Sequence, residues 1–125
     1  MEEPIWASYE KSLKRFEEVI GQPKTTITRD AAIQRFEFTS ELAWKSLQKF
    51  LREQKIICRS PKECLAEAFK FGLIADDELW LKVLEDRNLT VHTYNEEVAD
   101  EVYERLPNYL PLFEELNNKL NKSQK

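Results

Sequence analysis

The sequence has 125 residues, which is enough for one domain with a real core and too few for two. Only two glycines and five prolines are present and 34% of the residues are charged, so the composition favours helices over a turn-rich sheet. A net charge of −4 excludes a broadly basic nucleic-acid-binding protein. We therefore expect a single all-α domain over residues 1–125.

The charges are divided unevenly between two parts of the chain. Residues 29–62 contain eight Lys or Arg and four Asp or Glu, a net charge of +4. Residues 63–118 contain four Lys or Arg and fourteen Asp or Glu, a net charge of −10. A nucleic acid would therefore be bound locally. If the basic stretch at 45–62 lies near the motif at 86–95, which is described below, it supplies a positively charged path for a nucleic acid. If it faces away, a small nucleotide or a protein partner is favoured.

The sequence carries no targeting or membrane signal. No run approaches the roughly 18 apolar residues of a membrane span, and the acidic beginning MEEPIWASYEKSL is unlike a signal peptide. We therefore expect a cytoplasmic protein with no membrane partner. Cys58 and Cys64 are too few for a disulfide framework, and they lack the second Cys/His pair of a zinc site. We interpret them as reduced thiols in or near the core, and we expect no metal and no cofactor.

The first two expected helices follow from apolar residues that recur every three or four positions. The first runs to about Gly21, and its stripe consists of Trp6, Tyr9, Leu13, Phe16 and Ile20. The segment GQPKTT then breaks it. The second begins near Thr28 or Asp30 and reaches about Gln54. Its length predicts that it forms the spine of the core.

The next two expected helices are marked by their end signals. SPKE at 60–63 places a serine at the N-cap, proline at the first helical position and glutamate two further on, and Gly72 suits the other end. Asp76 or Asp77 can cap the following helix, which runs to about Asn88.

The last part of the chain is also expected to be helical. Asn95 can cap it, with two glutamates in its first turn where the helix dipole favours anions. Pro107 and Pro111 should kink or restart the helix, and residues 121–125 should fray. The whole chain thus predicts about five helices in an up-and-down, four-helix-bundle-like arrangement.

The stretch DRNLTVHTYN at 86–95 holds the one histidine of the chain, His92, five residues after Arg87. In a straight helix the two would lie roughly 140° apart, so they can share a target only if the helix ends near Leu89. Arginine stabilises charge on a phosphoryl group, and imidazole, with a pKa of about 6.5, moves protons at neutral pH. The pair is therefore a candidate nuclease site. RNA cleavage through the 2′-hydroxyl needs a base and an acid, which a symmetric dimer would supply from two copies of His92.

Ordinary structural roles are the alternatives for the same residues. A lone histidine after a helix end is more often a capping or surface residue than a catalyst. Tyr94, taken alone, fits a packed aromatic with a bonded hydroxyl better than a reactive group.

Three segments together resemble a known family, namely RFEFTSELAWKSLQKFL at 35–51, SPKECLAEAFKFGLI at 60–74 and RNLTVHTYNEE at 87–97. They are similar to the HEPN-type helical proteins encoded beside a minimal nucleotidyltransferase, also described as nucleotidyltransferase substrate-binding proteins. Arg87, His92 and Tyr94 match the family's Arg-x4-His-x-Tyr pattern, with the polar Asn88 in support.

The resemblance implies a function as well as a fold. It implies a homodimeric ribonuclease toxin that cleaves RNA without metal, with Arg87 and His92 as catalytic residues. The partner nucleotidyltransferase, acting as antitoxin, would silence it by attaching AMP to Tyr94. The first alternative is a noncatalytic subunit that binds a nucleotide or other substrate for the nucleotidyltransferase, and the second is a purely structural dimerising bundle.

Overall fold

The computed structural model describes residues 3–123, and these form five α-helices and one short 3-10 turn. The helices are α1 (Ile5–Ile20), α2 (Thr26–Glu53), α3 (Pro61–Phe71), α4 (Asp77–Leu89) and α5 (Glu96–Ser123), and the turn η1 (Thr90–His92) follows α4. The expected all-α class with about five helices is confirmed. Every helix of the described range is too short or too polar to cross a lipid bilayer.

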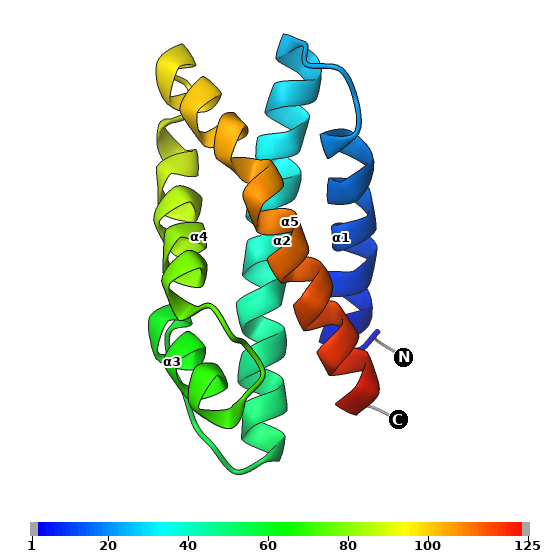
Figure 1. Ribbon diagram of the computed structural model, residues 1–125, viewed down its shortest axis with the longest axis vertical. Helices are drawn as coiled ribbons and strands as arrows, with labels where there is room; N and C mark the ends of the chain where they lie inside the picture. The colour runs from blue at the N-terminus through cyan, green and yellow to red at the C-terminus, as the bar shows by residue number, and fades with distance from the viewer. Residues whose placement is uncertain (1–2, 124–125) are drawn as a thin grey trace.

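Helix α2 is the spine of the bundle, as its length predicted. It contacts α1, α3, α4 and α5. Figure 1 shows α1 beside α2 on one side, α3 and α4 on the other, and α5 running obliquely across the front. The turn between α4 and α5 lies at the upper end of this view, while both chain termini lie near the lower end.

The centre of the bundle is filled by aromatic rings from four helices. The ring of Phe113 on α5 lies edge-on to Phe16 and to Trp80, with centroids 5.8 and 5.5 Å apart, and Phe36 stacks on Tyr109 at 5.7 Å. Each large apolar side chain buried in this way stabilises the fold by about 1.5–3 kcal/mol relative to exposure. The site at the end of α4 is therefore built on a rigid support.

Helix α2 begins earlier than the apolar pattern predicted. Thr25 Oγ1 accepts a hydrogen bond from the Thr28 amide at 3.0 Å, and the Thr28 hydroxyl oxygen accepts one from the Thr25 amide at 2.7 Å. This reciprocal cap satisfies two free amides, so the helix starts at Thr26 and not at Thr28 or Asp30.

The other predicted helix ends are confirmed. Ser60, Asp76 and Asn95 each accept hydrogen bonds from the amides of the helix that follows. Gly72 ends α3 with a φ of 98°, a backbone conformation that residues with a Cβ rarely adopt.

The sequence predicted a kink or a restart of α5 at its prolines, and the restart is not observed. The helix continues through Pro107 and Pro111, which are exposed and lie four residues apart on one face. Their missing N–H groups leave carbonyls free on the solvent side, where water can bind them. Residues 121–123 are also helical next to the buried Leu120, so the fraying expected there is not seen, and residues 124–125 lie outside the described range.

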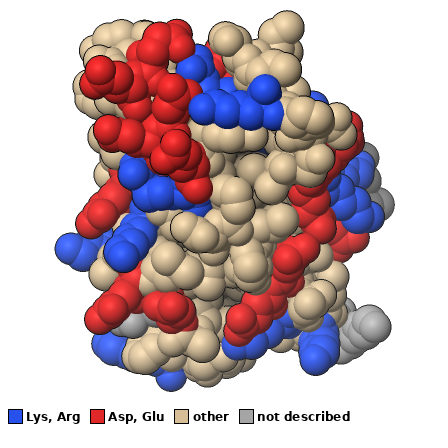
Figure 2. All heavy atoms as spheres, turned by 45° about the horizontal axis from the view of Figure 1, so that its top comes forward, with Lys and Arg blue, Asp and Glu red and all other residues tan. Residues whose placement is uncertain are grey.

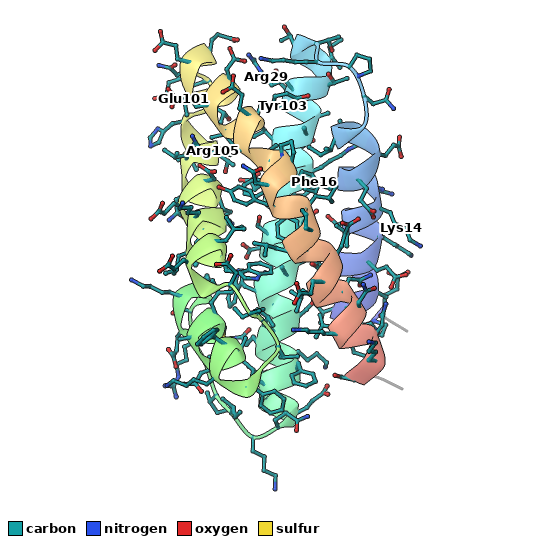
Figure 3. The ribbon with its side chains drawn as sticks, in the orientation of Figure 1. Lys14, Phe16, Arg29, Glu101, Tyr103 and Arg105 are labelled. Atoms are coloured by element: carbon teal, nitrogen blue, oxygen red, sulfur yellow. A yellow bond between two sulfur atoms is a disulfide. The ribbon has the colours of Figure 1, made fainter. Side chains whose placement is uncertain are left out.

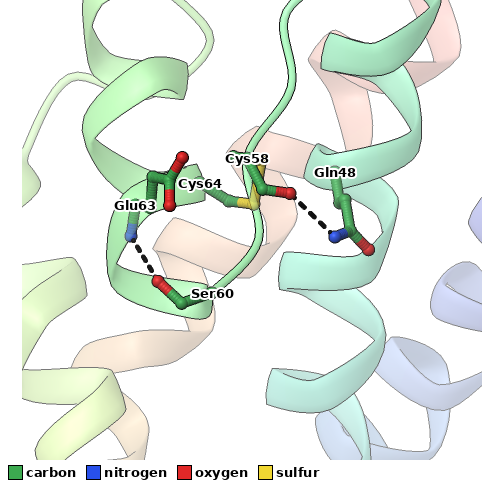
Figure 4. Close-up of a disulfide and its surroundings, with 5 residues drawn as sticks. All are labelled: Gln48, Cys58, Ser60, Glu63 and Cys64. Carbon is green, nitrogen blue, oxygen red and sulfur yellow. Dashed lines mark hydrogen bonds between the residues drawn. A yellow bond between two sulfur atoms is a disulfide. The ribbon is translucent and has the colours of Figure 1, made fainter.

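The two cysteines form a disulfide, so the prediction of reduced thiols was wrong. Cys58 and Cys64 are both buried, and their Cα atoms are 5.1 Å apart. The segment after α2 folds back onto the first turns of α3, where Ser60 caps the helix and Gln48 Nε2 donates to the Cys58 carbonyl at 2.9 Å (Figure 4). This return brings the two side chains within bonding range.

Candidate functional site

The stretch at 86–95 joins α4 to α5 through a tight turn. The Thr90 hydroxyl donates to the Arg87 carbonyl at 2.6 Å, and the Thr93 hydroxyl donates to the Thr90 carbonyl at 2.8 Å. Side-chain hydrogen bonds of this kind compete with the helical ladder. They help to end α4 at Leu89, which confirms the predicted helix end, and η1 follows directly.

Arg87 lies on the last turn of α4 and reaches across to α2. Its Nη2 atom is 2.7 Å from Glu41 Oε2, and the side chain keeps 34% of its surface exposed. Lys45 lies on the other side of the same carboxylate, at 3.3 Å. Burial alone would raise the pKa of Glu41, but Trp44 and the charges of Arg87 and Lys45 outweigh it and lower this pKa below its ordinary value. The ion pair is half open to solvent, so an incoming anion can reach Arg87.

Asp86 anchors the same helix end from the inside. It is only 3% exposed, and its two oxygens accept hydrogen bonds from Arg105 Nε at 2.8 Å and Nη2 at 2.7 Å. The Tyr109 hydroxyl donates to Asp86 at 2.5 Å. Burial and the neighbouring Asp86 raise the pKa of Tyr109, and the hydrogen bonds to Asp86 raise the pKa of Arg105. Figure 3 shows Arg105 on the side of α5 that faces α4.

Asp86 was missed in the sequence, although a signal was present. Trp80, Val83 and Asp86 follow one another at steps of three, so the aspartate continues a buried stripe. A carboxylate at such a position needs hydrogen-bond or cationic partners. Its cationic partner, Arg105, is a partly exposed residue of another helix, and the pattern within α4 does not reveal it.

His92 and Tyr94 lie on the exposed turn beyond the helix end. Their ring centroids are 6.1 Å apart and their planes make an angle of 71°, so both rings are on the same side of the chain. Tyr94 is 82% exposed, which excludes the packed-aromatic alternative. His92 is also exposed. Both side chains can therefore be reached by a large substrate.

Arg87 and Asn88 also line a groove between α2, α3 and α4. Its volume is about 610 Å³, and its walls include Trp44 of α2 and Lys62 of α3. Among the residues that the structure describes, the lining does not include His92 or Tyr94. The structure thus brings Arg87 and Asn88 together in the groove, and His92 and Tyr94 together on the adjoining turn.

The charges around this end of the bundle differ from one side to the other. Figure 2 shows acidic groups gathered at upper left, and the first turns of α5 contribute five acidic residues, Glu96, Glu97, Asp100, Glu101 and Glu104. Arg29 is buried beneath them and pairs with Glu96 at 2.7 Å and Asp100 at 3.1 Å. On the groove side, Lys62 belongs to the basic stretch at 45–62, which therefore does reach the motif. The groove lining on this side combines two cationic side chains, Lys62 and Arg87, with two carboxylates, Glu41 and Glu85.

Metal ligands are not clustered in the described part of the chain. Over residues 3–123, no group of three or more His, Cys, Asp and Glu side chains is placed to hold a metal ion.

The chain is thus an all-α bundle. It has an arginine at the end of α4 and an exposed histidine on the turn that follows. The family model described as nucleotidyltransferase substrate binding protein like matches residues 6–122. The chain belongs to this family. It is also 38% identical over 84 residues to the probable ribonuclease HepT of Haemophilus influenzae. That match takes in 63% of this chain and spans 58% of the relative's length.

Solved structures that share this fold include proteins of Thermus thermophilus, Haemophilus influenzae and Shewanella oneidensis. A protein of Thermus thermophilus is 42% identical with a TM-score of 0.85, over 90% of this chain and 98% of that one. The HI0074 protein of H. influenzae, described as a substrate binding domain of a nucleotidyltransferase, is 30% identical with a TM-score of 0.73 over 94% of each chain. A tri-AMPylated HEPN toxin of Shewanella oneidensis, in complex with an MNT antitoxin, shares the fold at 21% identity with a TM-score of 0.76, over 94% of each chain.

Proposed function

We propose that this protein is a HEPN-type ribonuclease toxin that acts as a homodimer and pairs with a minimal nucleotidyltransferase. The observation that carries the proposal is the end of α4, where a half-exposed Arg87 is followed by an exposed His92 on a tight turn. The similarity to the probable ribonuclease HepT supports this activity, and the family model supports the nucleotidyltransferase partner.

The cleavage step uses the 2′-hydroxyl of RNA as the nucleophile. A neutral His92 takes the proton from this hydroxyl while its oxygen forms a bond to the adjacent phosphorus. The bond from phosphorus to the 5′-oxygen breaks, and a protonated His92 of the partner subunit gives that oxygen a proton. The products are a 2′,3′-cyclic phosphate and a free 5′-hydroxyl, so no water or metal is consumed. Arg87 stabilises the charge that develops on the phosphoryl oxygens.

Arg87 must exchange one anion for another before it can do this. In the free protein its partner is Glu41, across a contact that is about one third exposed on both sides. Ion pairs of this exposure contribute only about 0–1 kcal/mol, so an RNA phosphate can replace the carboxylate. Asp86 has no part in the exchange and acts as a positioning residue that keeps α4 against α5.

Tyr94 supports a means of silencing the toxin. Its hydroxyl, on an 82% exposed side chain, can attack the α-phosphorus of ATP in a nucleotidyltransferase, which releases pyrophosphate and leaves AMP on the tyrosine oxygen. The added phosphate charge and bulk would stand beside His92, whose ring is 6.1 Å away. The AMPylated S. oneidensis toxin with this fold is consistent with such a modification.

The second candidate is a noncatalytic subunit that binds nucleotide or substrate for the nucleotidyltransferase. The groove beside Arg87 favours it, because this groove has room for a small ligand and lies next to the motif. The description of the H. influenzae HI0074 fold supports the same function.

RNA cleavage in EDTA separates the two candidates. We expect wild-type protein to cleave RNA and to run at twice the chain mass by light scattering, and His92→Ala and Arg87→Ala to be inactive while still folded. Lys14→Gln is the matched control, because Lys14 is exposed on α1 at the opposite side of the bundle (Figure 3). Equal cleavage by wild type and both motif variants, or none by wild type, would leave the binding subunit as the better account.

The Tyr94 modification has its own test. Intact-mass spectrometry after incubation with the nucleotidyltransferase and Mg·ATP should show increments of AMP on wild type and none on Tyr94→Phe. Tyr103 on α5 serves as the control, since Tyr103→Phe should be modified like wild type. An increment that survives in Tyr94→Phe would move the switch to another residue.

A further inference from the structure

The lining of the groove between α2, α3 and α4 includes side chains that have no role in the proposed cleavage step. Trp44 lines it from α2, and Leu81 and Leu84 line it from α4. Trp44 packs against the core on one side but is only partly buried. An indole ring with two leucines beside it offers a flat apolar surface of the kind on which nucleobases stack.

A buried hydroxyl in the same groove lacks a partner. Ser40 is 3% exposed and lines the groove, and its Oγ atom makes no hydrogen bond among the described residues. Leaving a buried polar group unpaired costs stability, and native structures have few such groups. Ser40 is therefore an indication, independent of Trp44, that a ligand completes this groove.

Two carboxylates in the lining limit which ligand fits. Glu41 and Glu85 both face the groove, and an ionised carboxylate accepts hydrogen bonds but donates none. When a phosphate binds Arg87, Glu41 Oε2 loses the partner that lies 2.7 Å away and can accept from the ligand, while Oε1 stays paired with Lys45. The groove thus favours a ligand that combines an anion for Arg87 with N–H donors for the carboxylates.

We propose that this groove binds one unpaired nucleotide and selects bases that carry an amino group. The base lies on Trp44, its N–H groups donate to Glu41 or Glu85, and its phosphate binds Arg87 and Lys62. Adenine, cytosine and guanine have an exocyclic amino group, whereas uracil presents only oxygen acceptors there. The proposal rests on the proposed function in one respect, namely that Arg87 binds phosphate, and it makes the groove the part of the site that reads the nucleotide beside the cleaved bond.

The test measures nucleotide binding separately from cleavage. Full-length His92→Ala protein is titrated with AMP, CMP, GMP, UMP and inorganic phosphate by calorimetry. We expect the three amino-bearing nucleotides to bind about tenfold more tightly than UMP or phosphate, because only they combine stacking with an exocyclic amino donor, whereas uracil has only its ring N3–H to donate and phosphate has no base. Equal affinity for all five probes would overturn the proposal.

Variants of the groove locate the binding. Trp44→Leu in the same background should weaken AMP, CMP and GMP by about tenfold and leave phosphate unchanged. Trp6→Leu is the matched control, since Trp6 is a partly buried tryptophan of α1 that is not in the groove lining. If Trp44→Leu loses helical content, Glu85→Gln takes its place: Glu85 is exposed, and its amide should reduce the preference over UMP. Unchanged selectivity in folded variants would overturn the assignment of the groove.

The result for the groove can be told apart from the result for the nuclease. If RNA cleavage depends on His92 but the protein shows no preference for the base, the ribonuclease proposal stands and the proposal of base-selective binding in the groove is refuted. Base-selective binding that depends on Trp44, in a wild-type protein that cleaves no RNA, would retain the groove and refute the nuclease.

Discussion

Asp86 and Arg87 are adjacent in sequence, but their side chains point to different sides of α4 and differ in burial. Asp86 points inward, is 3% exposed and makes three hydrogen bonds to Arg105 and Tyr109. Arg87 points outward, keeps a third of its side chain exposed and, among residues 3–123, has one ion-pair partner, Glu41. A buried group whose partners are all fixed is costly to change, whereas an open ion pair is easily exchanged. The same helix end thus has a permanent anchor and a replaceable contact.

Removal of the anchor should have the largest effect on stability. Asp86→Ala leaves Arg105 and the buried Tyr109 hydroxyl without their acceptor, and each hydrogen bond to a charged group lost in this way costs about 1.5–3 kcal/mol. Urea unfolding followed by circular dichroism measures the loss. Asp86→Asn keeps an acceptor oxygen and should lose less. If Asp86→Ala unfolded at the wild-type urea concentration, the inner side of α4 would not be the anchor.

Removal of the disulfide should have the next largest effect. Cys58 and Cys64 close a loop with a sequence separation of six residues, and loop-closure entropy for so short a loop is worth about 2 kcal/mol. Dithiothreitol should therefore lower the urea midpoint of wild type. The Cys58→Ser/Cys64→Ser double variant should unfold at the reduced midpoint with or without the reductant. An identical wild-type midpoint in both conditions would show that the bond does not stabilise the fold.

Alkaline pH should weaken the inner side of α4. Folding raises the pKa of Tyr109 above its ordinary value of 10.0, through burial first and Asp86 second. A group whose pKa is raised by folding contributes its full stability below the unfolded pKa and loses it as the pH rises toward the folded pKa. The free energy of unfolding should therefore fall above about pH 10. Tyr109→Phe should reduce this slope, and an unchanged slope would mean that other groups cause it.

Changes at Arg87 should have the smallest effect on stability and a large effect on activity. Its open pair with Glu41 is worth about 0–1 kcal/mol, so Arg87→Ala should unfold close to wild type. Arg87→Lys keeps the charge but loses the two-pronged contact with phosphate, so cleavage should still be impaired. Urea unfolding and RNA cleavage on the same preparations check both parts. An Arg87 variant that is much less stable than wild type but cleaves RNA fully would contradict the view that Arg87 acts in activity and Asp86 in stability.

The helix ends were predicted well because their signals are local. These signals act within a few residues of the helix that they begin or end, and each lies at the predicted position: Ser60, Gly72, Asp76 and Asn95. Thr25 was missed because its partner, Thr28, is another threonine and not the Glu or Gln that marks a capping box. Pro107 and Pro111 did not restart the helix, because both lie on its solvent-exposed face, where water can bind the carbonyls that lose their N–H partners.

The candidate site was predictable only in part. The β-branched threonines favour a helix end before His92 and Tyr94, whose rings share one side of the chain. The groove was not foreseen, because Ser40 and Trp44 belong to a helix that comes about forty residues earlier in the chain than Arg87.

The sequence by itself determined the helices, most of their ends and the order of the motif residues, because these depend on hydrogen bonds and side-chain periodicity within a few turns. The tertiary structure alone decided which residues from different helices meet: Asp86 with Arg105, Arg87 with Glu41, and Cys58 with Cys64 through the return of the chain onto α3. Such meetings depend on how the bundle packs around its aromatic core, and a buried charge or an open groove is defined only after several helices have come together.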